Sequence, residues 1–242
     1  MEPFRHIVSF AFSMIEKISA WSGDIDLENI RFHDDDAGVL IDQLEEGHGA
    51  IIICSHMGNM EILRALATHN KTKVNREFKV SSIVDFSGTA HFNKMIEKVN
   101  PASMMNLINA RDIGVDTVIE LQERLADGEL LVISGDRTAS TTAGKVEKLP
   151  FLGEPASFPQ GSFILASLMD APVYFMFGIR ENDMDPTSIY DLHIIRANTE
   201  FAGSRKERKK KIREIIKEYV SLLEGFCVEH PLQWYNFYNF WN

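Results

Sequence analysis

The sequence predicts a single-domain α/β protein in which a mixed, mostly parallel sheet is covered by helices on both faces. Short apolar segments rich in β-branched residues alternate with longer segments whose apolar residues recur at helical spacing. The short segments are apolar at nearly every position, as expected for strands that are buried on both faces. No proline-, glycine- or serine-rich linker divides the chain, so we expect residues 1–242 to form one domain.

The first predicted element is a helix over residues 4–21. Its apolar residues recur at helical spacing, and Phe10, Phe12 and Met14 make most of its other faces apolar as well. A helix that is apolar all round is either buried against the rest of the domain or in contact with lipid. The acidic run 34–36 that follows predicts a solvated loop rather than a metal site, because adjacent carboxylates point in different directions.

The remaining elements alternate as an α/β sheet requires. We expect helix 39–46, strand 49–54, helix 61–68, strand 80–85, helix 115–126, strand 129–134, helix 161–169, strand 171–179, strand 189–197 and helix 205–228. Gly128 is suited to end the helix before it. The strand over 189–197 alternates apolar and polar residues, which indicates an outer strand. One apolar stripe runs along the last helix from Ile212 to Phe226.

Composition and charge exclude several classes of protein. Apolar residues make up 45% of the chain and charged residues 25%, which is typical of a soluble globular protein rather than a disordered or fibrous one. The net charge of -10 argues against a general nucleic-acid binder. Cys54 and Cys227 lie too far apart for a zinc knuckle, and they indicate a reducing compartment. No secretory signal and no membrane-spanning stretch is evident, so we expect a soluble or peripheral protein.

The segment after the strand 49–54 carries candidate catalytic residues. His56 follows the last apolar residue of this strand, and Glu61 falls in the first turn of the next helix. A histidine at a strand end suits a general base, and a carboxylate would fix its tautomer and stabilise the imidazolium. Gly58 permits a tight turn, and Asn59 is suited to cap the helix. The alternative is a capping histidine beside an ordinary first-turn acid.

A second group of polar residues follows the strand 129–134. Arg137 is suited to bind a phosphate or carboxylate in a bidentate manner, positioned by Asp136, although a plain salt-bridged turn would explain both residues equally well. The apolar segment 150–161 is interrupted by prolines and glycines, which predicts a loop. Such a loop beside polar catalytic groups is suited to line a groove for an acyl chain.

Five segments in one order resemble the lysophospholipid acyltransferase superfamily, and within it the late lipid A biosynthesis acyltransferases. They are SHMGNME (55–61), SGDRT (134–138), LPFLGEPASFPQGSFILA (149–166), APVYFMFG (171–178) and QWYNFYNFW (233–241). The resemblance covers residues 4–242. It departs from the family at Asn239, where the branch has an aspartate, and in lacking the family's N-terminal transmembrane helix.

The resemblance implies a glycerolphosphate acyltransferase-like fold and the transfer of a fatty acyl group to a hydroxyl of a lipid or glycolipid. The donor would be a thioester of an acyl carrier protein or of CoA, with no covalent acyl-enzyme, no cofactor and no metal. The family's HxxxxE motif falls on His56 and Glu61, as general base and orienting carboxylate. The implied substrate-binding residues are Gly58, Asn59, Asp136, Arg137, Phe151, Gly153, Pro155, Phe158, Pro159 and Gly161.

Other chemistries fit the sequence less well. Cys54 lies inside an apolar strand, where a thiol stays protonated and unreactive. The chain has no GxSxG motif for a serine hydrolase, and its eight histidines include no HExxH, so we assign no metal. The alternative to an enzyme is a catalytically silent lipid-binding or scaffold protein of the same fold. The presence of both His56 and Glu61 favours the enzyme.

The basic run 205–213 holds seven basic residues and one acidic residue. The simplest interpretation is a solvated helix start, although bases at a helix N-terminus oppose the helix dipole. Alternatively, the run binds anionic lipid head groups or an acidic acyl carrier protein. Together with the helix 4–21 it predicts peripheral binding at the inner face of the cytoplasmic membrane, weakened by salt.

Overall fold

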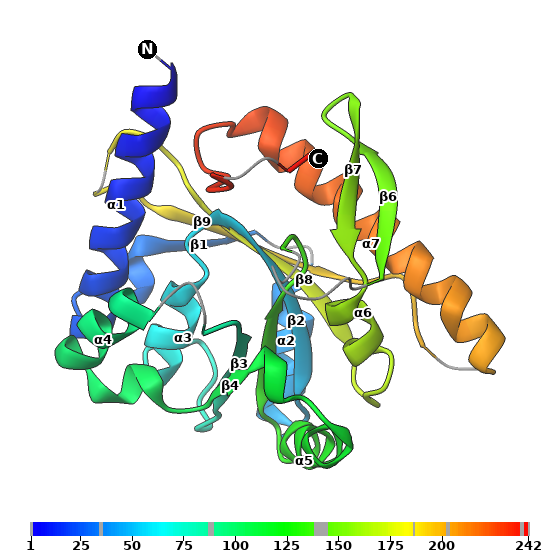
Figure 1. The fold of residues 1–242 in the computed structure, drawn as a ribbon. Coiled ribbons are helices and arrows are strands. Elements are labelled where there is room, and N and C mark those ends of the chain that lie inside the picture. The colour runs from blue at the N-terminus through cyan, green and yellow to red at the C-terminus, as the bar shows by residue number, and fades with distance from the viewer. Residues whose placement is uncertain are drawn as a thin grey trace.

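A computed structural model of the chain contains a central sheet with helices on both faces (Figure 1), so the predicted fold class is confirmed. The structure describes residues 2–33, 36–86, 90–137, 145–185, 187–201, 204–237 and 240–241. Its main sheet consists of β1 (Ile30–His33), β2 (Ala50–Gly58), β3 (Val80–Val84), β4 (Leu107–Asn109), β5 (Leu130–Ser134), β8 (Val173–Arg180) and β9 (Tyr190–Arg196). The strand order is β1-β9-β8-β2-β5-β3-β4.

The four neighbouring strand pairs from β8 to β4 are all parallel, and only the β8–β9 pair is antiparallel. From β2 the chain passes through a helix to β3 on one side of the sheet, and from β5 it returns to β8 on the other side. The carboxyl ends of β2 and β5 therefore form a topological switch point, where ligand sites of α/β proteins are found.

The helices divide between the two faces of the sheet. Their bounds are α1 (Glu2–Ser22), α2 (Ala37–Glu45), α3 (Glu61–Thr68), α4 (Ala90–Val99), α5 (Val115–Ala126), α6 (Gly161–Ala166) and α7 (Arg205–Glu229), with short 3₁₀ turns at Leu27–Asn29, Pro101–Met104 and Ala110–Asp112. Buried side chains of α1 to α4 share one core with Ile52 of β2, whereas α5 to α7 share the other core with Ile51 and Ile53. This alternation follows from the two-residue period of a strand.

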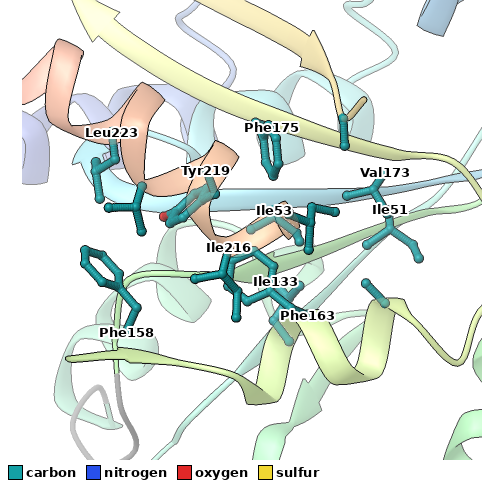
Figure 2. Close-up of a cluster of buried hydrophobic side chains, with 14 of the residues drawn as sticks. Ile51, Ile53, Ile133, Phe158, Phe163, Val173, Phe175, Ile216, Tyr219 and Leu223 are labelled. Atoms are coloured by element: carbon teal, nitrogen blue, oxygen red, sulfur yellow. The ribbon is translucent and has the colours of Figure 1, made fainter. Parts of the chain in front are cut away.

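Figure 2 shows the second core, in which Ile53 of β2 lies close to Ile216 and Tyr219 of α7, and Ile51 lies beside Val173 of β8. The Tyr219 hydroxyl donates a hydrogen bond of 2.9 Å to the carbonyl oxygen of Cys54. Because all these side chains are buried, α7 is fixed against the strand that leads to the candidate site.

The structure corrects the sequence prediction for residues 150–161. Instead of a loop, they belong to an antiparallel hairpin of β6 (Val146–Phe151) and β7 (Glu154–Pro159), followed by the start of α6. Prolines are tolerated here because the hairpin has only two strands and both are edges. The sequence patterns also missed β1, β4 and α4, and β1 and β4 are too short to show a clear period. Of the acidic run 34–36, residues 34 and 35 lie outside the described residues.

Helix α1 is oriented with its polar residues inward. Ser9, Ser13 and Glu16 are buried, and Glu16 pairs with the fully buried Arg180 of β8 at 2.8 Å. The opposite face exposes Phe4, Ile7, Ala11 and Ile15, which lie three or four residues apart. We call these four residues the outer stripe of α1. The sequence left two alternatives for this helix, burial against the domain or contact with lipid. Burial accounts for one face only, and no element among the described residues covers the apolar outer face.

Candidate active site

His56 lies near the carboxyl end of strand β2, at the switch point. Its neighbour Gly58 has a φ of 64°, and an added Cβ there would approach the Gly178 carbonyl oxygen to 1.7 Å. Only glycine can therefore occupy the point where β2 turns toward α3. Asn59 is buried and its backbone N–H donates to Gly178, but Met60 rather than Asn59 occupies the N-cap position of α3. The expected capping role of Asn59 is therefore wrong.

The His56 side chain is held by Asp136, which follows the neighbouring strand β5. Cys54 and Ser134 are paired in the register of these two parallel strands, so His56 and Asp136 each come two residues after the pair. The Nδ1 atom of His56 lies 2.8 Å from Oδ1 of Asp136. The backbone N–H of His56 donates to Oδ2 of the same carboxylate at 2.7 Å. One carboxylate thus binds both the ring and the backbone of the histidine.

Two further donors complete the surroundings of the Asp136 carboxylate. The Ser134 hydroxyl donates to Oδ1 at 2.7 Å, and the Trp234 indole N–H donates to Oδ2 at 3.1 Å. Asp136 has no exposed surface. Burial by itself raises the pKa of this carboxyl group, but the charge of His56 and the hydrogen bonds from His56 and Ser134 outweigh it and hold the pKa well below its usual value. Asp136 is therefore a buried carboxylate ion at neutral pH.

The other ring nitrogen of His56 is available to a substrate. The side chain of His56 is 33% exposed, and its Nε2 atom has no hydrogen-bond partner among the described residues. When Nδ1 donates its proton to Asp136, Nε2 carries a lone pair. This arrangement can accept a proton at Nε2, and Asp136 then stabilises the charged ring.

Glu61 does not contact His56, contrary to the sequence expectation. Its carboxylate accepts hydrogen bonds from the Trp21 indole N–H at 3.2 Å and from Arg64 at 3.2 Å. Glu61 begins α3, after the turn at Gly58 has changed the direction of the chain. Asp136, expected to lie on the acceptor side with Arg137, occupies instead the orienting position that Glu61 was expected to fill.

Arg137 lies at the same edge of the sheet as His56. Its guanidinium donates to the carbonyl oxygen of Tyr235 at 2.8 Å, and the backbone N–H of Tyr235 donates to the carbonyl oxygen of His56 at 3.0 Å. Arg137 is exposed, so its remaining N–H groups are open to solvent. His56, Asp136 and Arg137 thus lie at one edge of the sheet. Thr138, the last residue of the SGDRT segment, lies outside the described residues.

The segment expected to line an acyl groove has a different place. Phe151 and Phe158 are fully buried and form an aromatic cluster with Trp234, Phe240 and Trp241. The structure places the other implied binding residues of this segment as follows: Gly153 at the hairpin turn with a φ of 87°, Pro155 and Pro159 on β7, and Gly161 at the start of α6. The two phenylalanines are therefore core residues that support Trp234, and they leave no free surface for an acyl chain.

Three residues of this site escaped the sequence analysis. Ser134 and Trp234 bind Asp136, and Tyr235 joins His56 to Arg137. Trp234 and Tyr235 lie about a hundred residues beyond Asp136 in the chain, so no spacing rule connects them to it. The sequence indicated these two residues only through the QWYNFYNFW segment, which contributed to the family resemblance but whose residues were assigned no role.

The structure supports the exclusion of Cys54 as a nucleophile. Burial raises the pKa of the Cys54 thiol far above its usual value, and the nearby Asp136 carboxylate raises it further. We therefore expect Cys54→Ala to retain catalytic activity within about threefold of the wild type, since a protonated thiol is not a nucleophile. A thiol reagent should label neither cysteine in the folded protein, because both are buried. Loss of activity in a folded Cys54→Ala protein would reinstate the thiol as a candidate.

The fold and the site together define an α/β protein in which a buried carboxylate holds a partly exposed histidine at a topological switch point, where active sites of α/β enzymes lie. The model of the bacterial lipid A biosynthesis acyltransferase family matches residues 5–242. The chain belongs to this family, and it is an acyltransferase that acts on a lipid acceptor.

A search among curated proteins finds no match to this sequence. Within the described residues, no helix combines the length and the apolar character needed to cross a membrane.

Proposed function

We propose that His56 is the general base in the direct transfer of a fatty acyl group from a thioester to a hydroxyl of a lipid or glycolipid. Nε2 takes the proton of the hydroxyl while the oxygen attacks the thioester carbonyl. As the new ester bond forms and the carbon–sulfur bond breaks, the proton passes from His56 to the departing thiolate. The observation that carries this proposal is the 2.8 Å contact of Nδ1 of the partly exposed His56 with the buried Asp136, which leaves Nε2 without a partner among the described residues.

Asp136 takes the orienting role in this mechanism, and Arg137 acts on the substrate. The Asp136 carboxylate keeps the proton on Nδ1 and stabilises the imidazolium ion that forms during transfer. Arg137 binds an anionic group of the acceptor or the developing oxyanion through the N–H groups that Tyr235 does not use. Glu61 stays in the proposed site as a partly exposed carboxylate fixed by Arg64, without contact to the histidine.

The acyl donor in this proposal is a thioester of an acyl carrier protein or of CoA, and both are acidic. A groove of about 700 Å³ between α6 and α7 is lined by five basic residues and an apolar floor: Lys145, Lys206, Arg208, Lys209 and Arg213 with Ile164, Leu168 and Ile212. Its α6 wall begins beside the site, because Ser162 donates to the carbonyl oxygen of Ser134. Positive charge around an apolar groove matches the acidic surface of a carrier protein or the phosphates of CoA.

The acceptor in this proposal comes from a membrane surface, at the inner face of the cytoplasmic membrane. The outer stripe of α1 is apolar over about three helical turns. Phe237 adds a half-exposed ring that contacts Phe10 of α1. An amphipathic helix of this kind lies in the membrane interface with its apolar face toward the acyl chains. Figure 1 shows α1 and the basic start of α7 at opposite ends of the molecule, so the groove stays available for the donor.

We expect Ile7→Glu combined with Ile15→Glu to lower binding to phospholipid vesicles at least about tenfold, because each exposed isoleucine contributes roughly 1 kcal/mol or more on transfer from water. Co-sedimentation with anionic and with neutral vesicles measures the effect. Lys209→Glu is the matched control on α7, and it should leave vesicle binding close to the wild-type level, because the start of α7 lies at the opposite end of the molecule from α1. Unchanged binding of the double variant would contradict a membrane role for α1.

One assay tests the proposed reaction. Purified protein is incubated with acyl carrier protein thioester or acyl-CoA, together with vesicles of bacterial lipid extract, and the lipids are analysed by mass spectrometry. A lipid that gains one fatty acyl mass with either donor supports the proposal and identifies the donor. If neither donor gives a product that depends on His56, the proposed general-base transfer is wrong.

A further inference from the structure

Near the end of the chain, residues 233–235 cover the edge of β2 beyond the point where β5 ends. The backbone N–H of Gly58 donates to the carbonyl oxygen of Gln233 at 2.8 Å, and Trp234 forms an antiparallel bridge with Met57. Together with the bond from Tyr235 to His56 already described, these contacts pair the backbone of β2 from His56 to Gly58 with this segment. The segment therefore continues the sheet beside the candidate catalytic residue.

Gln233 anchors this segment to the other neighbour of β2. It is fully buried, its Oε1 accepts from the backbone N–H of Arg180 at 2.8 Å, and its Nε2 donates to the Arg180 carbonyl oxygen at 2.6 Å. These paired hydrogen bonds fix the segment to the end of β8. Trp234, the next residue, therefore starts from a fixed backbone position.

The Trp234 ring lies between the aromatic cluster and the Asp136 carboxylate. Its centroid is 5.1 Å from that of Phe151 and 5.0 Å from that of Phe240, both at steep interplanar angles. Its indole N–H donates to Oδ2 of Asp136, the same oxygen that accepts from the backbone of His56. Since tryptophan has only this one polar atom, the cluster aims a single donor at the carboxylate.

We infer that Trp234 is a positioning residue. It fixes the orientation of the Asp136 carboxylate, which in turn keeps the proton of the His56 ring on Nδ1 and leaves Nε2 free to act in acyl transfer. This inference rests on the proposed role of His56. Trp234 is buried and acts through Asp136, without contact to the reacting atoms. If the indole N–H is removed, the carboxylate can rotate about its bond to Cβ, and the bond that fixes the proton on Nδ1 of His56 weakens.

The test compares Trp234→Phe with Trp241→Phe. Both tryptophans belong to the same aromatic cluster, but the Trp241 indole donates to the carbonyl oxygen of Phe151 at 3.2 Å instead of to a carboxylate. For Trp234→Phe we expect kcat to fall about 10–100-fold, as for the loss of a hydrogen bond to a charged group, while KM for the acceptor changes less than about threefold. Trp241→Phe should keep kcat within about threefold of the wild type.

A second measurement separates this inference from the proposed reaction. Nitrogen-15 NMR of labelled histidine rings, with His56 assigned by comparison with His56→Gln, reports the tautomer without any turnover. The wild type and Trp241→Phe should show the proton on Nδ1, and Trp234→Phe should show a mixture of the two tautomers. Equal spectra and equal kcat for the two tryptophan variants would overturn the inference, even if His56 proves essential.

If Trp234→Phe fails to fold, Trp234 can be replaced with benzothienylalanine, which keeps the shape of the indole and substitutes sulfur for the N–H group. The same loss of kcat and the same mixture of tautomers are then expected. Wild-type values for both would overturn the inference, because they would show that only the packing of the ring matters.

Discussion

His56→Ala should lower the rate of acyl transfer by about 10²–10⁴-fold, the typical cost of losing a positioned general base. The protein should remain folded, because the side chain is partly exposed and the backbone bonds of residue 56 to Asp136 and Tyr235 do not depend on the ring. Initial rates of lipid acylation measure the effect, and circular dichroism checks the fold. If the folded variant retains more than roughly a third of the wild-type rate, His56 is not the base.

Asp136→Asn should cause a comparable loss, about 10²–10⁴-fold, although the side chain changes little in shape. Asp136 accepts hydrogen bonds from four donors, two at each oxygen. An amide has one oxygen and one NH₂ group, so one pair of donors would face another donor. If that NH₂ group faces His56, the ring must accept at Nδ1 and carries its proton on Nε2, where it can no longer act as a base.

Glu61→Gln is the matched control for Asp136→Asn, since it neutralises the other carboxylate near the site. Glu61 contacts Arg64 and Trp21 but not His56, so we expect this variant to retain clearly more activity than Asp136→Asn. The opposite order of the two variants would return the orienting role to Glu61. Of these two variants, we expect Asp136→Asn alone to change the tautomer of His56, because Glu61 forms no hydrogen bond with the ring.

The low pKa of Asp136 also predicts how this variant affects stability. A carboxyl group whose pKa is lower in the folded than in the unfolded protein stabilises the fold above its unfolded pKa of about 3.9, and this contribution is lost as the pH falls below that value. The free energy of unfolding of Asp136→Asn should therefore differ from the wild type more at neutral pH than near pH 3. Urea unfolding at the two pH values measures the difference.

Most secondary-structure elements were predictable because their signals are local. Helix α5 runs from Val115 to Ala126, as the sequence predicted, since glycines flank its amphipathic stripe at 114 and 128. The buried strands β2, β5 and β8 were found from their continuous apolar runs. The position of His56 at a strand end followed from the same signals, because a strand's last residues in an α/β sheet lie at the ligand-binding edge.

The partner of His56 was not predictable in the same way. Glu61 is five residues away in the sequence and was therefore the natural candidate, whereas Asp136 is eighty residues away. The register that pairs Cys54 with Ser134 decides which carboxylate meets the ring. That register depends on how the whole sheet is packed, because continuous apolar runs such as those of β2 and β5 carry no alternating pattern along the chain that would specify one alignment.

The sequence alone determined the fold class, the family and the location of the candidate base, because each depends on residue types and their periods along the chain. Only the tertiary structure decided that Asp136 orients His56, that Trp234 binds Asp136 and that α1 turns its serines and Glu16 inward. The physical reason is the same in all three cases. A buried polar group must be paired, and its partner is brought to it by the packing of distant elements rather than by its neighbours in the chain.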